Sequence, residues 1–566
     1  MKYLVLLVLS CLPQLLFSQA ERYDVVIQEI MADPTPVIGL PNAEYIELRN
    51  RSSKTINLLR WRIDNGSSAA IITSSYLLEP DSIVLLCSRT QLAAFSHVKN
   101  VIGLTSFPAI NNEGDLLRLK NADGKTIHAV AFDPSWYNSP VKANGGWSLE
   151  MIDIQQPCAK HNWSASSNTK GGTPGQMNSI NGKLTNTSKT ALLQCTALDE
   201  RTLILEFDSP LDSLSLTNIQ HYQLIENETS IQSAVAIPPL FNQTQLNLTN
   251  SLDSNKIYTL VLKNMLQCDQ KTTAEFSIRT GLSKIADKGD LVFNEVMFDP
   301  EPGGEDFIEL INTSNRIINA KQIQLSTRNA DGTIHSNTHQ YLTNFNLFPL
   351  EPVVLTTDTS HLMKKWNTAE KDRLLLVKSL PSMPDDDGNI VLMNYLGKVI
   401  DEMKYDKYMH HPLLRNKEGV SLEKINIRAP SQQKDNWHSA ASSVNYASPT
   451  KMNSQFREQQ ATNNWIQFSP DLMHPNNSGQ NDYLQITYQF DEPGTQLTVH
   501  LFNQDGVKVC TIINNLICGL NGSFNWNGLD NQQRYISTGI YIAVADAFHL
   551  NGTRKRFKKV IAIKRA

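Results

Sequence analysis

The chain has 566 residues, which exceeds the size of one hydrophobic core and indicates several domains. Hydrophobic residues make up 40% and charged residues 19%, a composition that excludes a disordered chain. The 51 basic and 55 acidic residues leave a net charge of −4, which gives no general attraction to nucleic acid or to an anionic membrane.

The first 20 residues have the order of a cleavable export signal. Lys2 supplies a positive charge, residues 3–16 are mostly apolar, and small residues stand at Ser18 and Ala20. No later stretch approaches the roughly 20 apolar residues that span a bilayer. We therefore expect residues 1–20 to be a signal peptide, and the mature chain to be secreted or held at the outer-membrane surface.

Residues 21–180 are expected to form a first domain of short strands. Residues 25–31 are rich in β-branched and apolar side chains and end at the turn Asp33-Pro34. Residues 45–48 alternate, which places Tyr45 and Glu47 on one face and Ile46 and Leu48 on the other. An Asp-Gly pair at 123–124 predicts a hairpin turn.

The same pattern returns in residues 288–455, so one domain has been duplicated. The opening strand, the Ile-Glu-Leu-x-Asn strand and a late Asn-Trp pair recur in order. Helical periodicity is scarce, and residues 360–371 are the best helix candidate. The recurring positions are Glu29, Asp33, Glu47 and Trp163 in the first copy and Glu295, Asp299, Glu309 and Trp437 in the second.

These motifs resemble the lamin tail domain, an Ig-like sandwich that also occurs in exported bacterial proteins. The resemblance rests on the Glu-[Ile/Val]-Met-x-Asp-Pro opening, the Ile-Glu-Leu-x-Asn strand and the Asn-Trp pair followed by Thr173-Pro174-Gly175. The second copy departs from this pattern at Ser448-Pro449-Thr450, which lacks the glycine. The resemblance implies two Ig-like sandwiches that span about half of the chain.

Two further domains are expected around the second copy. Residues 187–283 resemble the bacterial Ig-like domains of surface-layer proteins through the phrase at 207–211, Asn218 and Tyr222. Residues 464–566 resemble the Ig-like domain of the flagellar hook-capping protein and the terminal domains of exported Bacteroidetes proteins, through 526–528 and 539–541. The second resemblance implies a role in type IX secretion and surface anchoring. The predicted fold class is all-β, with serial Ig-like β-sandwich domains.

Six cysteines remain after removal of the signal peptide, and an even number in an exported chain suggests disulfides. They fall two to a domain, and the second copy lacks counterparts of both cysteines of the first. We therefore predict the pairs Cys87–Cys158, Cys195–Cys268 and Cys510–Cys518.

The recurring carboxylates are the candidate chemical site. Glu29, Asp33 and Glu47, with Glu295, Asp299 and Glu309, could act as an acid/base pair or bind a hard cation. Alternatively, they satisfy backbone amides and turns at one end of the sandwich. No Cys or His ligand set accompanies them, which favours the structural alternative.

The other polar and charged runs are weaker candidates for a binding or catalytic site. Asp385, Asp386 and Asp387 are candidates for a calcium site, but they lack the spacing and closing Glu of an EF-hand. His410-His411 is expected to lie in a solvated loop, and the basic run at 554–559 to protect a strand edge or contact export machinery. We expect no metal, no cofactor and no nucleic-acid partner.

The function expected from this organisation is a structural or adhesive surface protein without catalytic activity. Its partner would be a protein or glycan of the cell envelope or extracellular space, and the last domain would contact the secretion machinery. Two alternatives remain: a cation-dependent hydrolase that uses the recurring carboxylates, and a carbohydrate-binding protein. The latter would use the aromatic side chains Trp136, Tyr137, Tyr405 and Tyr408.

Overall fold

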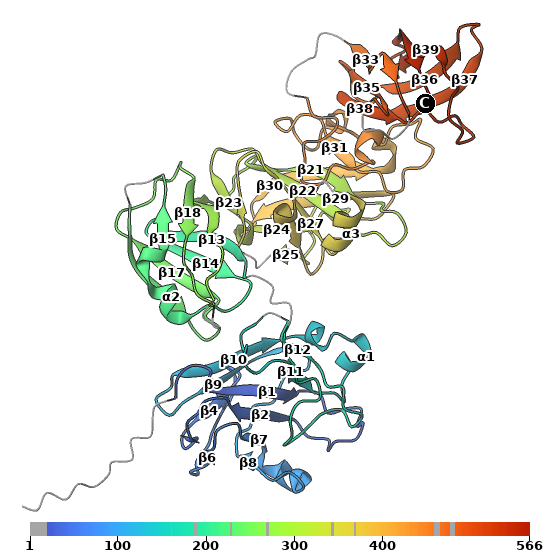
Figure 1. Cartoon of the computed structure of the whole chain (residues 1–566). Helices are drawn as coiled ribbons and strands as arrows, with labels where there is room; N and C mark the ends of the chain where they lie inside the picture. Colours follow the sequence, from blue (N-terminus) through green and yellow to red (C-terminus); the bar gives the residue numbers. More distant parts are fainter. Residues whose placement is uncertain are drawn as a thin grey trace, which may run out of the picture. The chain divides into compact units, whose positions relative to one another are not determined.

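The computed structural model describes residues 20–159, 161–184, 190–226, 229–267, 271–340, 344–366, 369–457, 464–475 and 481–565. The chain divides into two compact units, residues 1–252 with 258–280 and residues 253–257 with 281–566. Strands dominate both units (Figure 1). The signal peptide predicted for residues 1–20 lies almost wholly outside the described residues.

Helices are short in the described residues, and none is long and apolar enough to cross a bilayer. The α-helices are α1 (Pro140–Ala143), α2 (Ser213–Thr217) and α3 (Thr359–Lys365). The 3₁₀ turns are η1 (Arg89–Phe95), η2 (Pro134–Tyr137), η3 (Ile219–His221), η4 (Ala320–Gln322), η5 (Lys371–Arg373), η6 (Lys407–Met409), η7 (Lys434–Asn436) and η8 (Ser442–Val444). The helix predicted at 360–371 thus ends early, where the Trp366 indole N–H bonds to the Asn445 carbonyl at 3.2 Å.

The first unit opens with a sandwich that we call copy 1 (residues 20–184). Its larger sheet has the order β12-β11-β1-β2-β7-β8, with bounds Trp163–Ala165, Leu149–Met151, Val25–Met31, Tyr45–Asn50, Ile83–Ser88 and Val101–Leu104. The facing sheet is β10-β9-β4-β5 (Thr126–Phe132, Asp115–Lys120, Arg62–Asp64, Ala69–Ile71), and β3 (Ile56–Asn57) pairs with β6 (Leu77–Leu78). The core between the two sheets includes Ile27, Leu48, Ile63 and Leu119.

β1 and β2 are buried along their whole length, because both faces of the larger sheet are covered. One face packs on the core. The other face carries Tyr45 and Met31, which pack on Phe95 of η1. The face of β2 that carries Tyr45 and Glu47 is therefore also buried from water, although it points away from the core between the two sheets.

A second sandwich completes the first unit. One sheet is β13-β14-β17-β16 (Leu192–Asp199, Thr202–Phe207, Gln243–Leu248, Ile231–Ile237), and the other is β15-β18-β19 (Tyr222–Leu224, Tyr258–Leu262, Phe276–Thr280). β14 buries every second residue, as its alternating sequence predicts. Phe207 and Phe276 meet across the two sheets, with ring centroids 6.0 Å apart.

The second unit begins with copy 2 (residues 286–457), which repeats the strand order of copy 1. Its larger sheet is β28-β27-β22-β21-β31-β32 (Leu374–Leu376, Pro352–Thr356, Phe307–Asn312, Leu291–Met297, Leu422–Lys424, Trp437–Ser439). The facing sheet is β25-β24-β29-β30 (His339–Gln340, Ile323–Thr327, Asp387–Asn394, Val399–Asp406). A small sheet joins β20-β23-β26 (Ser283–Lys284, Ile317–Asn319, Asn346–Leu347). The register shift before Glu29 in β1 recurs before Glu295 in β21.

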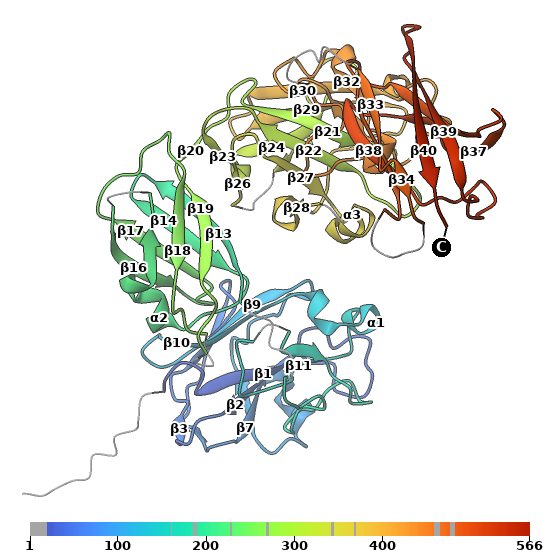
Figure 2. The ribbon, with the colours of Figure 1, turned by 45° about the horizontal axis from the view of Figure 1, so that its top comes forward.

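The last sandwich packs β33-β35-β38 (Trp465–Ser469, Leu484–Gln489, Asn521–Trp526) on β34-β40-β39-β36-β37. The bounds of the larger sheet are Leu472–Met473, Arg554–Ile563, Gly539–Phe548, Gln496–Asn503 and Lys508–Ile517. Figure 2 shows the long arrows of this sheet, in red, beside one another. The described chain is thus a series of Ig-like β-sandwiches.

Candidate functional site

Strand pairing brings the recurring glutamates together. In copy 1, Glu29 of β1 lies opposite Glu47 of β2 on one side and Glu150 of β11 on the other. Copy 2 repeats this register with Glu295, Glu309 and Glu423. We call each set a glutamate cluster, and all six side chains are fully buried.

The cluster of copy 1 binds the end of its own domain, residues 172–180, which we call the closing tail. The Thr173 amide donates to Glu29 Oε1 at 2.8 Å, and the Gly175 amide donates to Glu47 Oε1. Glu150 Oε2 accepts from the Ile180 amide at 3.1 Å. Each glutamate thus satisfies backbone N–H groups of a segment that has no strand partner of its own.

Copy 2 makes the same bonds to its closing tail, residues 447–455. The Ser448 amide donates to Glu295 at 2.9 Å and the Thr450 amide to Glu309 at 2.6 Å. The Gln455 amide donates to Glu423 at 2.9 Å. The glycine missing from copy 2 does not change the turn, because Thr450 adopts a φ of +64° where Gly175 has +75°.

Burial raises the pKa of the carboxyl groups of Glu29, Glu47, Glu295, Glu309 and Glu423. The pKa of Glu309 rises to about 8, mainly because burial removes water from the carboxylate. Burial and the neighbouring Glu309 and Glu423 raise the pKa of Glu295, and burial and Glu29 raise that of Glu47. Burial therefore favours the protonated form of these five acids, and a substrate cannot reach either cluster unless the tail moves.

The two recurring aspartates take a different part. Asp33 follows β1, and its carboxylate accepts from the Thr35 amide at 3.0 Å. The Asp33 carbonyl accepts from Gly146 at 2.8 Å, and the Asp299 carbonyl accepts from Gly419 at 2.7 Å. These aspartates therefore organise the turn after the first strand of each copy.

Sequence patterns missed other members of the site. Glu150 and Glu423 complete the clusters, and Asn178 and Asn453 anchor the tails through bonds to backbone carbonyls of the larger sheet. The repeated phrases Ser-Leu-Glu and Met-Asn-Ser contain these residues and could have identified them. Trp163 and Trp437 are buried core residues of β12 and β32.

Asp385, Asp386 and Asp387 are exposed, and Asp386 pairs with Lys407 at 2.6 Å. Among the residues that the structure describes, no group of three or more His, Cys, Asp and Glu side chains is placed to hold a metal ion. His410 and His411 are each only 2% exposed, so the predicted solvated loop is wrong. The His410 ring lies 5.4 Å from that of Phe298 in copy 2, whereas His411 lies beside Gly494 of the last sandwich.

The predicted disulfides are not formed. Cys87, Cys195, Cys510 and Cys518 are buried thiols, and Cys268 lies outside the described residues. Cys158 is disulfide-bonded, but Cys87 is not its partner. Cys158 lies in the segment after β11. In the larger sheet, β1 and β2 lie between β11 and β7, the strand that carries Cys87, so β11 and β7 are about 14 Å apart. Cys510 lies opposite Leu501 whereas the Cys518 amide bonds to Thr495, which puts the two thiols roughly 20 Å apart along the sheet.

The strand order defines an array of Ig-like sandwiches, and the buried clusters close two of them, copy 1 and copy 2, on their own tails. Residues 18–133 match the family model described as Lamin Tail Domain. This match extends through β10 of copy 1. No curated protein matches the chain.

Several solved structures match the chain at low sequence identity. Surface layer protein SbsC, domains 1–6, matches at 11% identity and a TM-score of 0.16, over 67% of this chain and 55% of that chain. A tetra-tandem repeat from the extending region of a large adhesion protein matches at 9% identity and a TM-score of 0.14, over 94% and 99%. PorZ, a surface component of the type-IX secretion system of Porphyromonas gingivalis, matches at 9% identity and a TM-score of 0.15, over 80% and 56%.

The chain spans about half the length of the SbsC structures that it matches, 44% and 55% of two of them.

Proposed function

We propose that this protein is a non-catalytic structural or adhesive component of the bacterial cell surface, with two lamin-tail-like domains. The observation that supports the proposal best is the use of the glutamate clusters. Both copies use their recurring glutamates to bind their own closing tails, and the carboxylates of these glutamates have no exposed surface. Sandwiches closed in this way suit spacing and presentation of loops.

The rival hydrolase function makes a different prediction for Glu29. We expect the mature chain, residues 21–566, to release no product from DNA or phosphate esters above a buffer control, with Mg²⁺, Mn²⁺ or Ca²⁺ present. The Glu29→Gln variant should change thermal stability alone. Metal-stimulated turnover that disappears in Glu29→Gln, but persists in the exposed-residue variant Glu418→Gln, would refute the proposal.

The last sandwich is proposed to direct secretion and anchoring. In the described residues, β34 pairs only with the end of β40, at Ala562 and Ile563. The remainder of β40 therefore offers an edge to which another strand could add. Arg554 and Arg556 lie within 3.3 Å and 2.7 Å of Asp546, and Lys559 lies 2.8 Å from Asp471, so part of the basic run is paired.

Truncation after residue 462 in the native host tests this role. The shortened chain should fold and remain in the periplasm, because it lacks the sorting sandwich. Fractionation with surface protease treatment measures its location. Arrival of the truncated chain at the surface at the normal level would show that the last sandwich is only a spacer.

Carbohydrate binding is a second candidate, favoured by one cavity. A space of about 600 Å³ in the first unit is lined by Trp136, Trp163, His161 and Asp208, among others. The rings of Trp136 and Trp163 lie 6.1 Å apart. Of the other aromatic candidates, Tyr137 and Tyr405 are buried, and Tyr408 is 81% exposed. A glycan-array signal lost in Trp136→Ala but kept in Tyr408→Ala would support this function.

A further inference from the structure

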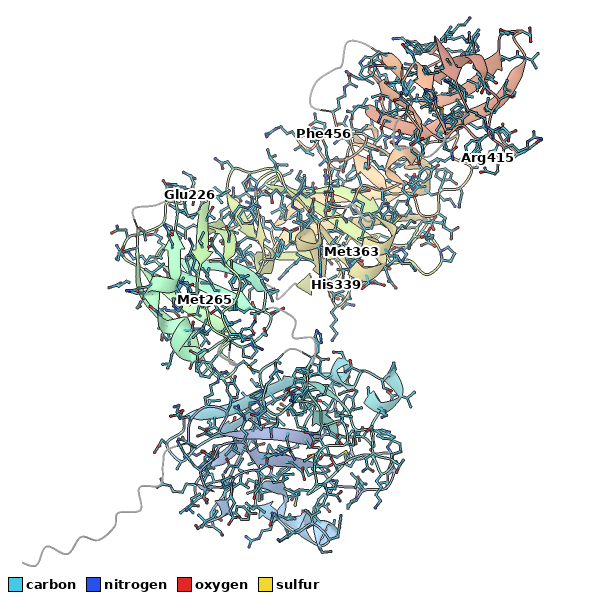
Figure 3. All side chains as sticks on the ribbon, viewed as in Figure 1. Glu226, Met265, His339, Met363, Arg415 and Phe456 are labelled. Atoms are coloured by element: carbon cyan, nitrogen blue, oxygen red, sulfur yellow. The ribbon has the colours of Figure 1, made fainter. Side chains whose placement is uncertain are left out.

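Copy 2 contains a cavity of about 480 Å³ between its larger sheet and the residues around its closing tail. Its volume is within the range of small-molecule sites. Much of the wall is apolar, formed by Ile311, Leu350, Pro352, Met452 and Phe456. Phe456, labelled in Figure 3, comes from the chain that leaves the tail. Met452 and Leu350 are 72% and 57% exposed, so apolar surface faces solvent at this place.

Cationic side chains share the lining with these apolar groups. Arg373, Arg428, Lys451 and Arg457 all line the cavity, and none of its lining residues is acidic. Acidic partners stand outside the lining: Glu351 is 3.6 Å from Arg373 and Glu492 is 3.8 Å from Arg457, and Glu370 pairs with Lys451. Such partly exposed pairs are weak, so a bound anion could compete for the same cations.

Copy 1 provides an internal comparison. Backbone hydrogen bonds that recur in both copies show which positions correspond: Arg428 of copy 2 corresponds to Gln155 of copy 1, and Lys451 corresponds to Gln176. The amides of Arg428 and Gln155 both bond to the side chain two residues before them, and those of Lys451 and Gln176 bond to Ser448 and Thr173. β27 of copy 2 corresponds to β7 of copy 1, and the register of the next strand then places Arg373 at the position of Asn100.

The fourth pair is Arg457 and Gly182, whose amides bond to the carbonyls of Ile425 and Ile152 at 2.8 and 2.9 Å. Asp153 of copy 1 is replaced by Asn426. Copy 2 thus has four cations that copy 1 lacks at this end, and it lacks the anions Asp81 and Asp153 and the cation Arg49, whose positions are taken by Leu350, Asn426 and Ile311. Copy 1 closes its tail with the same bonds and without these charges, so the fold does not require them.

We propose that this cavity binds an anionic amphiphile, a carboxylate or phosphate carried on an apolar chain. The apolar wall takes the chain, and the guanidinium groups of Arg373, Arg428 and Arg457 with the Lys451 ammonium take the charged head. Each guanidinium group can donate two parallel N–H bonds to two oxygens of a carboxylate or a phosphate head. This site is independent of the proposed structural role.

Calorimetric titration of the mature chain, residues 21–566, with decanoate, decyl phosphate and neutral decanol tests the proposal. Both anions should bind, and decanol should bind roughly tenfold more weakly, because it cannot use the charge-assisted contacts. The tighter of the two anions indicates whether a fatty acid or a phospholipid-type head is the natural source. Equal binding of decanol and decanoate, or no binding of either anion, would overturn the proposal.

The double variant Arg428→Ala/Lys451→Ala identifies the site. It should lower the affinity for decanoate about tenfold, through loss of two charged contacts. The matched variant Gln155→Ala/Gln176→Ala changes the same positions in copy 1 and should leave affinity unchanged. Because the Arg428 side chain is exposed, Arg428→Glu provides a second variant that should fold and bind more weakly still. Equal losses in the copy 1 and copy 2 variants would refute the assignment of the site.

Discussion

At the scale of the residue, the unusual feature is a set of buried acids. Each cluster places three glutamates on neighbouring strands with no exposed surface. Dehydration of a carboxylate is costly, and hydrogen bonds from tail amides offset only part of that cost. The raised pKa values of Glu295 and Glu309 follow from this balance.

Glu309→Gln should reduce the pH dependence of copy 2. The pKa of Glu309 is about 8 in the folded chain against an ordinary value of 4.5, so the folded state binds this proton more tightly. The contribution of Glu309 protonation to the free energy of unfolding is fully present below pH 4.5 and is lost as the pH rises through 8. Gln keeps an oxygen for the Thr450 amide but does not ionise.

Calorimetric unfolding at pH 6 and pH 8.5 measures this effect. The melting temperature of the wild-type transition that contains copy 2 should be lower at pH 8.5 than at pH 6, by roughly 2–4 °C for each kcal/mol of unfolding free energy that is lost. The shift should be smaller in Glu309→Gln, and unchanged in the exposed control Glu418→Gln. A shift in Glu309→Gln as large as that of the wild type would contradict the argument.

At the scale of the element, the closing tail depends on one turn with positive φ. A Cβ built on Gly175 lies 2.5 Å from Val98 Cγ1. Thr450 adopts the same backbone conformation in copy 2, and its hydroxyl accepts the Glu370 amide at 2.7 Å. The two copies thus keep one turn with different side chains.

Gly175→Ala should destabilise copy 1 by roughly 2–3 kcal/mol, from left-handed strain of about 1–2 kcal/mol plus the contact with Val98. Denaturant unfolding measures the loss. Gly182→Ala is the matched control in the same segment, because its Cβ would meet only the Ile180 carbonyl at 3.7 Å. Equal stability of the two variants would show that the turn is not strained by a side chain.

At the scale of the whole molecule, histidines join copy 2 to the last sandwich within the second unit. The rings of His411 and His438 lie 5.4 Å apart, and a Cβ built on Gly494 would lie 2.1 Å from His438 Nε2. His549 bonds to the neighbouring Pro493 carbonyl at 3.1 Å. Burial, with repulsion from His438 and His549, lowers the pKa of His411 to about 4.

Acid should therefore loosen this junction. The folded pKa of His411 lies below its ordinary value of 6.5, so the stability it contributes is present above pH 6.5 and is lost as the pH falls through 4. The Leu520 amide of the last sandwich donates to the Ser454 carbonyl of copy 2 at 3.1 Å, so residues 517–520 lie at this junction. Hydrogen exchange, corrected for intrinsic rates, should show less protection of the amides at 517–520 at pH 5 than at pH 7. The difference should shrink in His411→Gln, which cannot gain a charge; an undiminished difference would exclude His411 as its origin.

The sequence by itself determined the strands, the duplication and the hairpin turns. Alternation at 45–48 and the Asp-Gly turn at 123–124 depend on neighbouring residues, and the structure has β2, β9 and β10 there. Only the tertiary structure decided which polar side chains are buried. Local pattern reports the side of a strand on which a residue lies, whereas burial depends on distant segments: the closing tail covers Glu47, and the last sandwich lies against His411. For the same reason, the short sequence separation of Cys510 and Cys518 could not predict that one long strand holds them too far apart to form a disulfide.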